Sequence, residues 1–307
     1  MSVSVGICAY NEGLNIGPLL SNVLYEQELS SESEVLVVCS GCTDNTVSIV
    51  QEFAEKDKRI KIIVENERQG KASAVNQVLK NANGDSLIFI SADTMPYKKC
   101  FTKLISRLQV PSVGVVCARP QPINNSKSLA DKLVRVLWSF HDHVFREVSN
   151  AGIAKHASEV YCIRKNIANS IPPETINDDA FIALTAKNKG WSICYESESV
   201  VSICGPETIP DYIRQRRRVI FGHHQIKKLT GEPPQYFVPL LRLDKKRRRH
   251  LIYSLFNEFD IATILTFISI ELLLNALTIF DAVIGKSYSM WNVAYSTKKI
   301  LSSELNQ

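Results

Sequence analysis

The segment 84–96, GDSLIFISADTMP, constrains the fold most strongly because it joins a buried strand to an acidic residue. Residues 86–90 are mostly apolar and too few for a helix, so they predict a buried strand. Asp93 follows that strand, and Pro96 stops any regular continuation. Open α/β sheets bind ligands beyond the carboxyl ends of parallel strands, and Mg²⁺ shares carboxylate and phosphate oxygens. Asp93 therefore either holds a metal–diphosphate group or caps the next turn.

Strands and helices alternate at short spacing ahead of this segment. Apolar, β-prone runs predict strands at 3–9, 34–39 and 60–65, and helical periodicity predicts helices at 15–29, 46–56 and 70–81. This alternation predicts a parallel sheet with right-handed crossovers. The loops that begin at Tyr10, Ser40 and Ser91 should therefore converge at one edge of the sheet. Asp44 is the expected N-cap of the second helix.

Four short motifs at these strand ends resemble the family-two glycosyltransferases, which have the GT-A fold. The motifs are CAYNE at 8–12, SGCTDNT at 40–46, GKASAVN at 70–76, and GD at 84–85 with ADT at 92–94. The resemblance covers roughly residues 3–230 and is strong because the motifs occur in the family's order and spacing. It implies an α/β protein with a Rossmann-like nucleotide-binding half and a mixed-sheet acceptor half.

The same resemblance implies a nucleotide-diphosphate sugar as donor. The residues that it places at the donor are Ala9, Tyr10, Asn11, Glu12, Ser40, Lys71, Ala92 and Asp93. Asp93 keeps the position that binds Mg²⁺ or Mn²⁺ in the family. Ser40 stands where the family commonly has an acidic residue that contacts the base, and Ser91 replaces the first aspartate of its Asp-x-Asp motif.

An acidic pair opens an apolar helix in the second half of the chain. Asp178 and Asp179 could simply favour the helix N-terminus, but capping needs only one of them. In the resembling family the second residue of such a pair is the general base, which implies that role for Asp179. We expect His141 and Glu159 on the acceptor or diphosphate side.

Further strands are predicted at 113–119 and 158–164, and a short edge strand at 193–195. A helix is predicted at 128–148. It carries His141 and His143, which should face different directions because they are two residues apart.

A helix predicted at 210–231 carries an arginine run. Residues 215–219, QRRRV, resemble the Gln-x-x-Arg-Trp element of processive family members, with Val219 in place of the tryptophan. The resemblance places Gln215 at the acceptor or diphosphate. Arg217 and Arg218 are expected to neutralise the leaving diphosphate through bidentate contacts.

The C-terminal part has a different character, so we expect a catalytic domain at 1–235 and a basic, apolar helical segment at 236–307. Residues 261–284 would form a helix of about 36 Å, long enough for a bilayer core of about 30 Å. Polar residues gather on one of its faces, and a charged Glu271 in lipid would cost about 2.5–3.5 kcal/mol unless protonated or paired. A spanning, an interfacial and a packed helix all remain open. The basic run 245–249 favours the cytoplasmic face.

Composition and cysteine spacing add limits. The chain has 307 residues and a net charge of +5, with 45% hydrophobic residues, as in ordinary globular proteins. Cys39 and Cys42 form a CxxC, but no second pair completes a zinc site. The first residues lack the features of a signal peptide, so cytosolic synthesis with free thiols is expected.

The leading hypothesis is an inverting glycosyltransferase at the cytoplasmic membrane face, acting on a lipid-linked or saccharide acceptor. A lipid-phosphate acceptor is already anionic and would need little help from Asp179. A nucleic-acid-binding protein is an alternative because of the arginine runs, but no accompanying motif supports it, so no nucleic acid is expected. A non-catalytic scaffold is favoured by Ser40 and Ser91 and opposed by the retained Asp93 and Asp179. A nucleotidyltransferase would need a glycine-rich N-terminal phosphate loop with a basic signature, which the sequence lacks.

Overall fold

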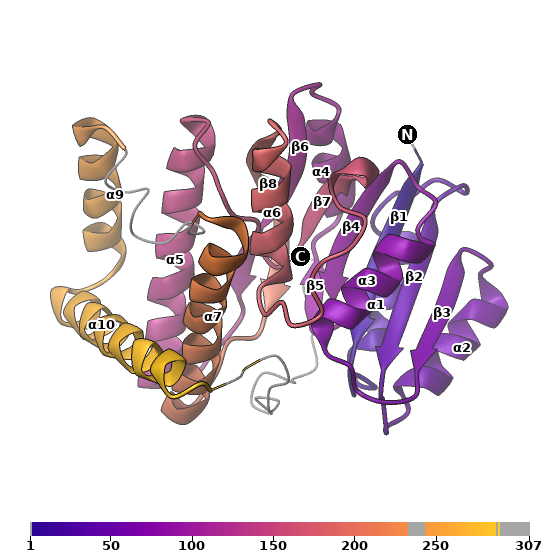
Figure 1. Ribbon diagram of the computed structural model, residues 1–307, viewed down its shortest axis with the longest axis horizontal. Helices are drawn as coiled ribbons and strands as arrows, with labels where there is room; N and C mark the ends of the chain where they lie inside the picture. Colours follow the sequence, from indigo (N-terminus) through magenta and orange to yellow (C-terminus); the bar gives the residue numbers. More distant parts are fainter. Residues whose placement is uncertain (1, 233–242, 287, 289–307) are drawn as a thin grey trace.

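The computed structural model describes residues 2–232, 243–286 and 288. Within these ranges a mixed sheet of eight strands runs in the order β3-β2-β1-β4-β7-β6-β8-β5, with helices on both faces (Figure 1). The strands are β1 Val3–Ala9, β2 Glu34–Ser40, β3 Ile60–Glu65, β4 Ser86–Ser91, β5 Thr94–Pro96, β6 Val113–Pro122, β7 Tyr161–Arg164 and β8 Ser192–Ile203. The helices are α1 Ile16–Tyr25, α2 Thr46–Lys56, α3 Lys71–Asn81, α4 Cys100–Leu108, α5 Leu129–Asn150, α6 Asp178–Asn188, α7 Ile209–Thr230, α9 Lys245–Glu258 and α10 Ile261–Val283, with a 3₁₀ turn at Lys165–Ile167.

The first half of the sheet is parallel, as the alternation predicts. β1 pairs in parallel with β2 and with β4, and β3 pairs in parallel with β2. Apolar residues point to both sides of these strands, so α1 and α2 cover one face and α3 covers the other. A Cβ on Gly6 would lie 2.4 Å from Cγ1 of Val78, so the glycine allows α3 to pack closely on β1.

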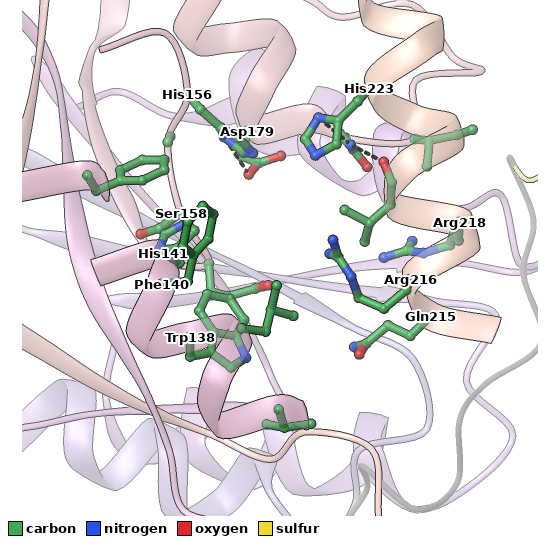
Figure 2. Close-up of a pocket in the computed structure, with 18 of the residues that line it drawn as sticks. Trp138, Phe140, His141, His156, Ser158, Asp179, Gln215, Arg216, Arg218 and His223 are labelled. Atoms are coloured by element: carbon green, nitrogen blue, oxygen red, sulfur yellow. Dashed lines mark hydrogen bonds and ion pairs between the residues drawn. The ribbon is translucent and has the colours of Figure 1, made fainter. Parts of the chain in front are cut away.

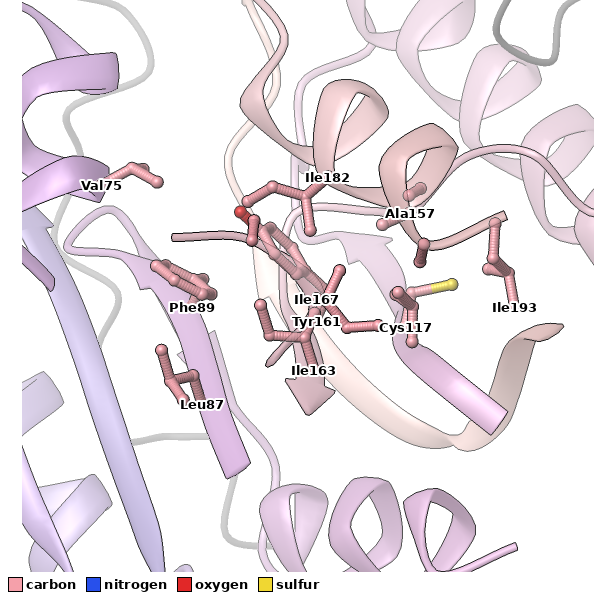
Figure 3. Close-up of a cluster of buried hydrophobic side chains, with 14 of the residues drawn as sticks. Val75, Leu87, Phe89, Cys117, Ala157, Tyr161, Ile163, Ile167, Ile182 and Ile193 are labelled. Carbon is pink, nitrogen blue, oxygen red and sulfur yellow. The ribbon is translucent and has the colours of Figure 1, made fainter. Parts of the chain in front are cut away.

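The second half of the sheet is mixed. β7 is antiparallel to β4 and to β6, and the rings of Phe89 and Tyr161 stack 5.1 Å apart across the β4–β7 pair (Figure 3). β8 pairs with β6 on one side and with β5 on the other. The prediction of a short edge strand at 193–195 is therefore wrong. The observed strand is longer and internal, because β5 lies outside it and pairs with its second half.

The predicted end of one helix also changes. α1 ends at Tyr25 and not at residue 29. The chain turns there because the side chain of Gln27 donates to Oδ1 of Asn22 at 2.8 Å and to the carbonyl of Tyr97 at 3.0 Å, while Glu28 takes a positive φ of 52°. These contacts cannot form if the helix continues.

The N-cap of α2 is Asn45, so the prediction of Asp44 is wrong by one position. Asp44 still contributes to this helix start, because its Oδ1 accepts a hydrogen bond from the backbone N–H of Thr46 at 3.0 Å. Its Oδ2 accepts from the N–H of Gly13 at 3.0 Å. Asp44 therefore ties the start of α2 to the loop after β1.

The C-terminal helices share a core with the rest of the chain. α10 lies across α7 and α5, and its Phe267 and Leu274 join Leu133 of α5 and Tyr212 of α7 in one buried cluster (Figure 1). The predicted boundary after residue 235 falls outside the described residues and stays a prediction.

Ion pairs fasten α10 to α7. The side chain of Glu271 is 1% exposed and accepts from Nε and Nη2 of Arg216 at 2.9 and 2.8 Å, and from the Tyr212 hydroxyl at 3.1 Å. Asp281 accepts from Nη2 of Arg217 at 2.6 Å. Glu271 and Asp281, two of the polar residues on one face of the apolar segment, are therefore paired and buried.

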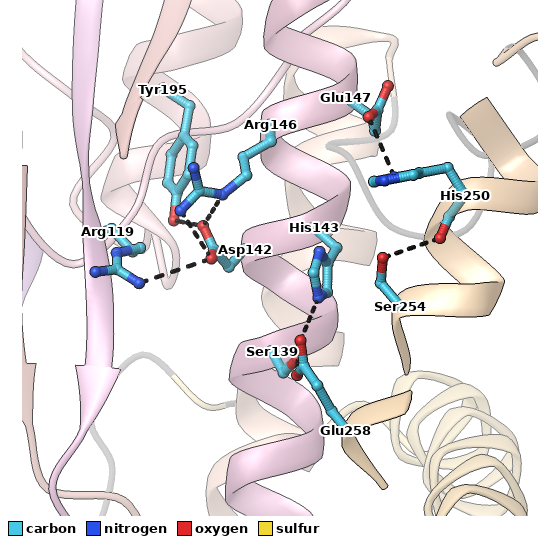
Figure 4. A network of polar contacts seen from close by, with 10 residues as sticks. All are labelled: Arg119, Ser139, Asp142, His143, Arg146, Glu147, Tyr195, His250, Ser254 and Glu258. Atoms are coloured by element: carbon cyan, nitrogen blue, oxygen red, sulfur yellow. Dashed lines mark hydrogen bonds and ion pairs between the residues drawn. The ribbon is translucent and has the colours of Figure 1, made fainter. Parts of the chain in front are cut away.

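Polar contacts also tie α9 to α5 (Figure 4). Nε2 of His143 lies 2.8 Å from Oε1 of Glu258, and Nη1 of Arg247 lies 3.2 Å from Oε2 of Glu147. His143 thus faces α9, whereas His141 lines a pocket on another side of α5. The prediction that these two histidines face different directions is confirmed.

We expect Arg216→Met to lower the free energy of unfolding by about 3–5 kcal/mol, because it leaves Glu271 buried without its cation. Urea unfolding followed by circular dichroism measures this loss. Arg214→Met is the matched control, since Arg214 is 53% exposed and pairs with Asp211 at the surface, where such pairs contribute at most about 1 kcal/mol. Adding Glu271→Leu to Arg216→Met should recover part of the lost stability. Equal stability of the Arg216→Met and Arg214→Met variants would show that the buried pair of Arg216 and Glu271 does not contribute the expected stability.

Candidate active site

A pocket opens between α5, the start of α6 and α7, next to the sheet edge where the parallel strands end (Figure 2). It holds about 1250 Å³ of empty space, including its open mouth. Its polar lining consists of Lys71, His141, His156, Ser158, Glu159, Asn177, Asp178, Asp179, Gln215, Arg216, Arg218 and His223. Aromatic side chains from α5 and α10 complete the wall, among them Trp138, Phe145 and Phe267. The structure thus brings together six of the residues predicted for catalysis or for the acceptor, and Lys71 from the donor set.

Asp178 is the structural member of the acidic pair. It is 2% exposed, and its carboxylate lies 3.1 Å from Nζ of Lys71 and accepts from the Tyr161 hydroxyl at 2.9 Å. Burial alone would lower the pKa of Lys71, but the charges of Asp178, Glu159 and Asp179 outweigh it and raise that pKa. Lys71 therefore stays protonated and holds α3 against the first residue of α6.

Asp179 is the carboxyl group with the chemistry of a base. Burial, followed by the negative charge of Asp178, raises its pKa to about 7, although Lys71 and Arg218 act in the opposite direction. Its Oδ2 lies 3.3 Å from Nδ1 of His156 (Figure 2). Burial lowers the pKa of His156 to about 4, so this imidazole is neutral near pH 7. A carboxylate that titrates near neutral pH is suited to accept a proton from a bound hydroxyl.

Glu159 and Arg218, which line the pocket, interact electrostatically with Asp93. Burial raises the pKa of Glu159, and the charges of Asp179 and Asp93 add to the shift. Burial lowers the pKa of Arg218, while Glu159, Asp178, Asp179 and Asp93 oppose that shift. Asp93 therefore lies within electrostatic range of the pocket, although it belongs to the loop after β4.

The predicted donor loops converge at one sheet edge. The backbone N–H of Thr43 donates to Oδ1 of Asn11 at 2.8 Å, which joins the loops after β1 and β2. The N–H of Gln69 donates to the hydroxyl of Ser40 at 3.2 Å, which joins the loops after β2 and β3. The N–H of Ala92 donates to the carbonyl of Cys8 at 3.1 Å, which adds the loop after β4. The predicted convergence is confirmed.

Other donor-loop residues have visible structural partners. The guanidinium of Arg68 lies 4.1 Å from the ring centroid of Tyr10, so this ring is already stacked on a cation. Oε2 of Glu12 accepts from the side chain of Asn15 at 3.0 Å, and Glu12 is 7% exposed. Ala9 is buried at the end of β1. Their roles in donor binding stay predictions.

The arginine run divides between two tasks. Arg218 lines the pocket, whereas the guanidinium of Arg217 is engaged by Asp281 at the contact of α7 with α10. The ion pair gives Arg217 a structural partner, and the expected contact of Arg217 or Arg218 with a diphosphate stays a prediction. Arg216 lines the pocket as well, but its charge is paired with Glu271.

Two pocket histidines, His156 and His223, are not predicted by any sequence pattern used above. The rings of His156 and His223 lie 5.4 Å apart, and burial lowers the pKa of each. His223 follows Gln215 by eight residues, two helical turns on the same face of α7, and this spacing could have revealed it. His156 lies ahead of β7, where no periodicity marks its direction.

The oxygen ligands at this edge fit a hard divalent cation only with help from a substrate. In the part of the chain that the structure describes, no group of three His, Cys, Asp or Glu side chains could hold a metal alone. Asp93 provides one carboxylate beside the donor loops, and Mg²⁺ or Mn²⁺ sites of this kind take their remaining oxygens from phosphates and water. The prediction that Asp93 holds such an ion therefore requires oxygens from a bound substrate.

Comparisons with known proteins agree with this architecture. The family model for glycosyl transferase family 2 matches residues 4–168. The poly-beta-1,6-N-acetyl-D-glucosamine synthase of Staphylococcus aureus (strain COL) is 27% identical over 229 residues, which cover 72% of this chain and 54% of that protein. The corresponding synthase of Staphylococcus epidermidis is 26% identical over 230 residues. This chain spans about half the length of these relatives.

Solved structures share the fold. The mannosyltransferase PcManGT from Pyrobaculum calidifontis, in complex with GDP-Man and Mn²⁺, superposes with a TM-score of 0.63 at 23% identity, covering 93% of this chain and 76% of its own. Residues 1–349 of S. aureus TarS, in complex with UDP-GlcNAc, give a TM-score of 0.52 at 14% identity and cover 95% of both chains. The predicted GT-A fold is confirmed.

We predict that Asp178→Asn lowers the pKa of Asp179 from about 7, because it removes the neighbouring negative charge that helps to raise it. Carboxyl ¹³C shifts followed over a pH titration measure the change. Asp142→Asn is the control, since Asp142 lies on α5 and is not among the charges that shift the Asp179 pKa. An Asp179 titration that is the same in all three proteins would show that Asp178 does not set its proton affinity.

Proposed function

This chain belongs to glycosyl transferase family 2, and on that premise we propose that it transfers a sugar from a nucleotide-diphosphate sugar to a lipid-linked or saccharide acceptor with inversion. The observation that carries the proposal is the placement of Asp179. Its carboxyl group has a pKa near 7 in a pocket that also contains Lys71 and Arg218, beside the loops expected to bind the donor. The nucleotide sugars named with the two structural neighbours support the donor class.

In the proposed reaction the carboxylate of Asp179 accepts the proton of the acceptor hydroxyl. The acceptor oxygen forms a bond to the anomeric carbon on the face opposite the diphosphate, and the bond from that carbon to the diphosphate oxygen breaks. The electron pair leaves with the nucleoside diphosphate, whose charge meets the guanidinium of Arg218. Gln215 and the aromatic wall of the pocket orient the acceptor, and Asp178 keeps the start of α6 in place.

We also propose that Asp93 holds Mg²⁺ or Mn²⁺. Such an ion supplies positive charge to the diphosphate when the donor is bound. The Mn²⁺ named with the mannosyltransferase neighbour supports a divalent metal. Ser91, the last residue of β4, lies two positions before Asp93 and brings no charge, so the proposed metal contact depends on the Asp93 carboxylate.

A membrane surface is the proposed place of action, on the cytoplasmic side. α10 is a helix of 23 residues that is long and apolar enough to cross a bilayer by length and composition, and the basic residues of α9 precede it. A lipid-linked acceptor would then be presented where the pocket can reach it. If that acceptor is a lipid phosphate, its oxygen is already anionic and the contribution of Asp179 falls.

Asp93→Asn should abolish the dependence of nucleotide binding on metal, because it removes the carboxylate that we propose to hold the ion. Calorimetry of UDP and GDP with and without Mn²⁺ tests this. Asp85→Asn is the matched control, since Asp85 directly precedes the first residue of β4, whereas Asp93 follows the last. Unchanged Mn²⁺-dependent affinity in the Asp93→Asn protein would remove this residue from the metal site.

Asp179→Asn should reduce transfer by about 10²- to 10⁴-fold while donor affinity is retained, because asparagine cannot accept the proton. In the unmodified protein, transfer should increase as the pH rises through about 7, since the base acts only when deprotonated. Asp178→Asn should shift this rise to lower pH. Rates measured from the donor found by calorimetry test all three. A wild-type rate for Asp179→Asn with a hydroxyl acceptor would exclude the assigned base.

A further inference from the structure

α10 has two faces of opposite character. A stripe with helical spacing is buried against α5 and α7 and consists of Ile264, Phe267, Glu271, Leu274, Thr278 and Asp281. The opposite face is apolar and exposed, with side chains such as Leu265, Leu272, Leu273, Ile279, Phe280 and Val283 each at least 56% accessible. Exposed Ile252, Tyr253 and Phe256 of α9 are also apolar. We call the exposed apolar side chains of α9 and α10 the outer face. Single exposed apolar residues are normal on a soluble protein, but the outer face includes many such residues on two consecutive helices.

The buried stripe fixes α10 along the catalytic part of the chain. Glu271 and Asp281 are ten residues apart, about 15 Å along a helix, and both are paired with successive arginines of α7. Leu274, between these two pairs, is buried against α7. Phe267, one turn before Glu271, lines the active-site pocket. The helix is therefore held lengthwise on the protein surface and not by one end.

We propose that α9 and α10 dock flat on the surface of an anionic lipid bilayer, with the outer face immersed at the level of the headgroups and first acyl carbons. Interfacial helices lie in this way when one face is apolar and the other is held elsewhere. Charge complementarity specifies the lipid: Lys245, Lys246, Arg248 and Arg249 are exposed at the start of α9. Each basic residue near an anionic surface contributes about 1 kcal/mol.

The ion pairs argue against a helix that spans the bilayer. Insertion of α10 across the membrane would separate Glu271 and Asp281 from Arg216 and Arg217, or would carry α7 and the pocket into lipid. A charged residue at the centre of a membrane helix costs about 2.5–3.5 kcal/mol, so two unpaired carboxylates would oppose insertion strongly. Flat docking keeps both pairs and buries the exposed apolar side chains.

Flat docking places the active site close to the lipid surface. Phe267 lines the pocket from the inner side of α10, so one helix diameter, about 10–12 Å, separates the pocket wall from the headgroups. An acceptor anchored in the bilayer could reach Asp179 without leaving it. This last consequence rests on the proposed function, whereas the docking itself does not.

The first test measures binding of the full chain to vesicles by flotation, without any activity assay. Phosphatidylcholine vesicles with a quarter phosphatidylglycerol should bind the protein, pure phosphatidylcholine should bind it more weakly, and high salt should release part of it. Leu272→Glu with Phe280→Glu should reduce binding at least about tenfold, because both charges enter the apolar layer. Tyr25→Glu with Val110→Glu is the matched control, since these exposed side chains lie on the catalytic part.

Circular dichroism and nucleotide calorimetry on both double variants separate docking from folding and from the proposed function. The proposal is supported if Leu272→Glu with Phe280→Glu loses vesicle binding but keeps its circular dichroism spectrum and its nucleotide affinity. This result supports docking through the outer face even if no transfer is ever detected. Equal vesicle binding by both double variants would overturn the proposal. A second result would also overturn it: the unmodified protein does not bind vesicles and forms a dimer, and of the two double variants only Leu272→Glu with Phe280→Glu dissociates that dimer.

A second test separates flat docking from spanning. Alkaline phosphatase fused after Gln307 of the full chain, in a bacterial host, is inactive if both ends of the protein lie in the cytoplasm. We expect the inactive result, with the fusion protein recovered in the membrane fraction. An active phosphatase, at a level similar to that of a fusion exported by a known spanning helix, would show that the chain crosses the membrane and would overturn flat docking.

Discussion

The buried carboxylate of Asp178 is the contact on which both halves of the site depend. It meets the ammonium of Lys71 at the start of α3, and it accepts from the hydroxyl of Tyr161 on β7. One side chain thus joins the parallel half of the sheet, its antiparallel continuation and α6. A buried charge is tolerated only when its partners are in place, so these elements must come together in one geometry.

The same contact determines the chemistry of the next residue. Asp179 follows Asp178 at the start of α6, where the helix dipole would favour its ionised form. Burial and the charge of Asp178 outweigh this and move its pKa to about 7. Adjacent residues therefore have different roles: Asp178 is fixed by its contact with Lys71, and its charge helps to raise the pKa of Asp179 to about 7.

Sequence patterns predicted the elements that are set by local periodicity. The strands Val3–Ala9 and Ile60–Glu65 and the helix Thr46–Lys56 have their predicted bounds, because apolar runs and helical spacing suffice there. The convergence of the donor loops followed from the parallel order alone. The internal position of β8 was not predictable, since it depends on β5, a three-residue strand that pairs with it across about a hundred residues of sequence. The placement of His156 beside Asp179 likewise depends on the path of the coil before β7.

The arginine run shows most clearly what a motif leaves undetermined. Three successive guanidinium groups have the same intrinsic chemistry, but a helix turns each by about 100° from the last, so they cannot share one target. The acids of α10 take Arg216 and Arg217, and Arg218 is left to the carboxylate cluster of the pocket. The partners of Arg216 and Arg217 come from residues 271 and 281, outside any motif that includes the arginines. Phe267 of α10 lines the pocket, and so does Arg216 of α7, which is paired with Glu271 of α10. A shift of α10 along α7 would therefore move two parts of the pocket wall. The helix with the outer apolar face is therefore also a structural part of the pocket.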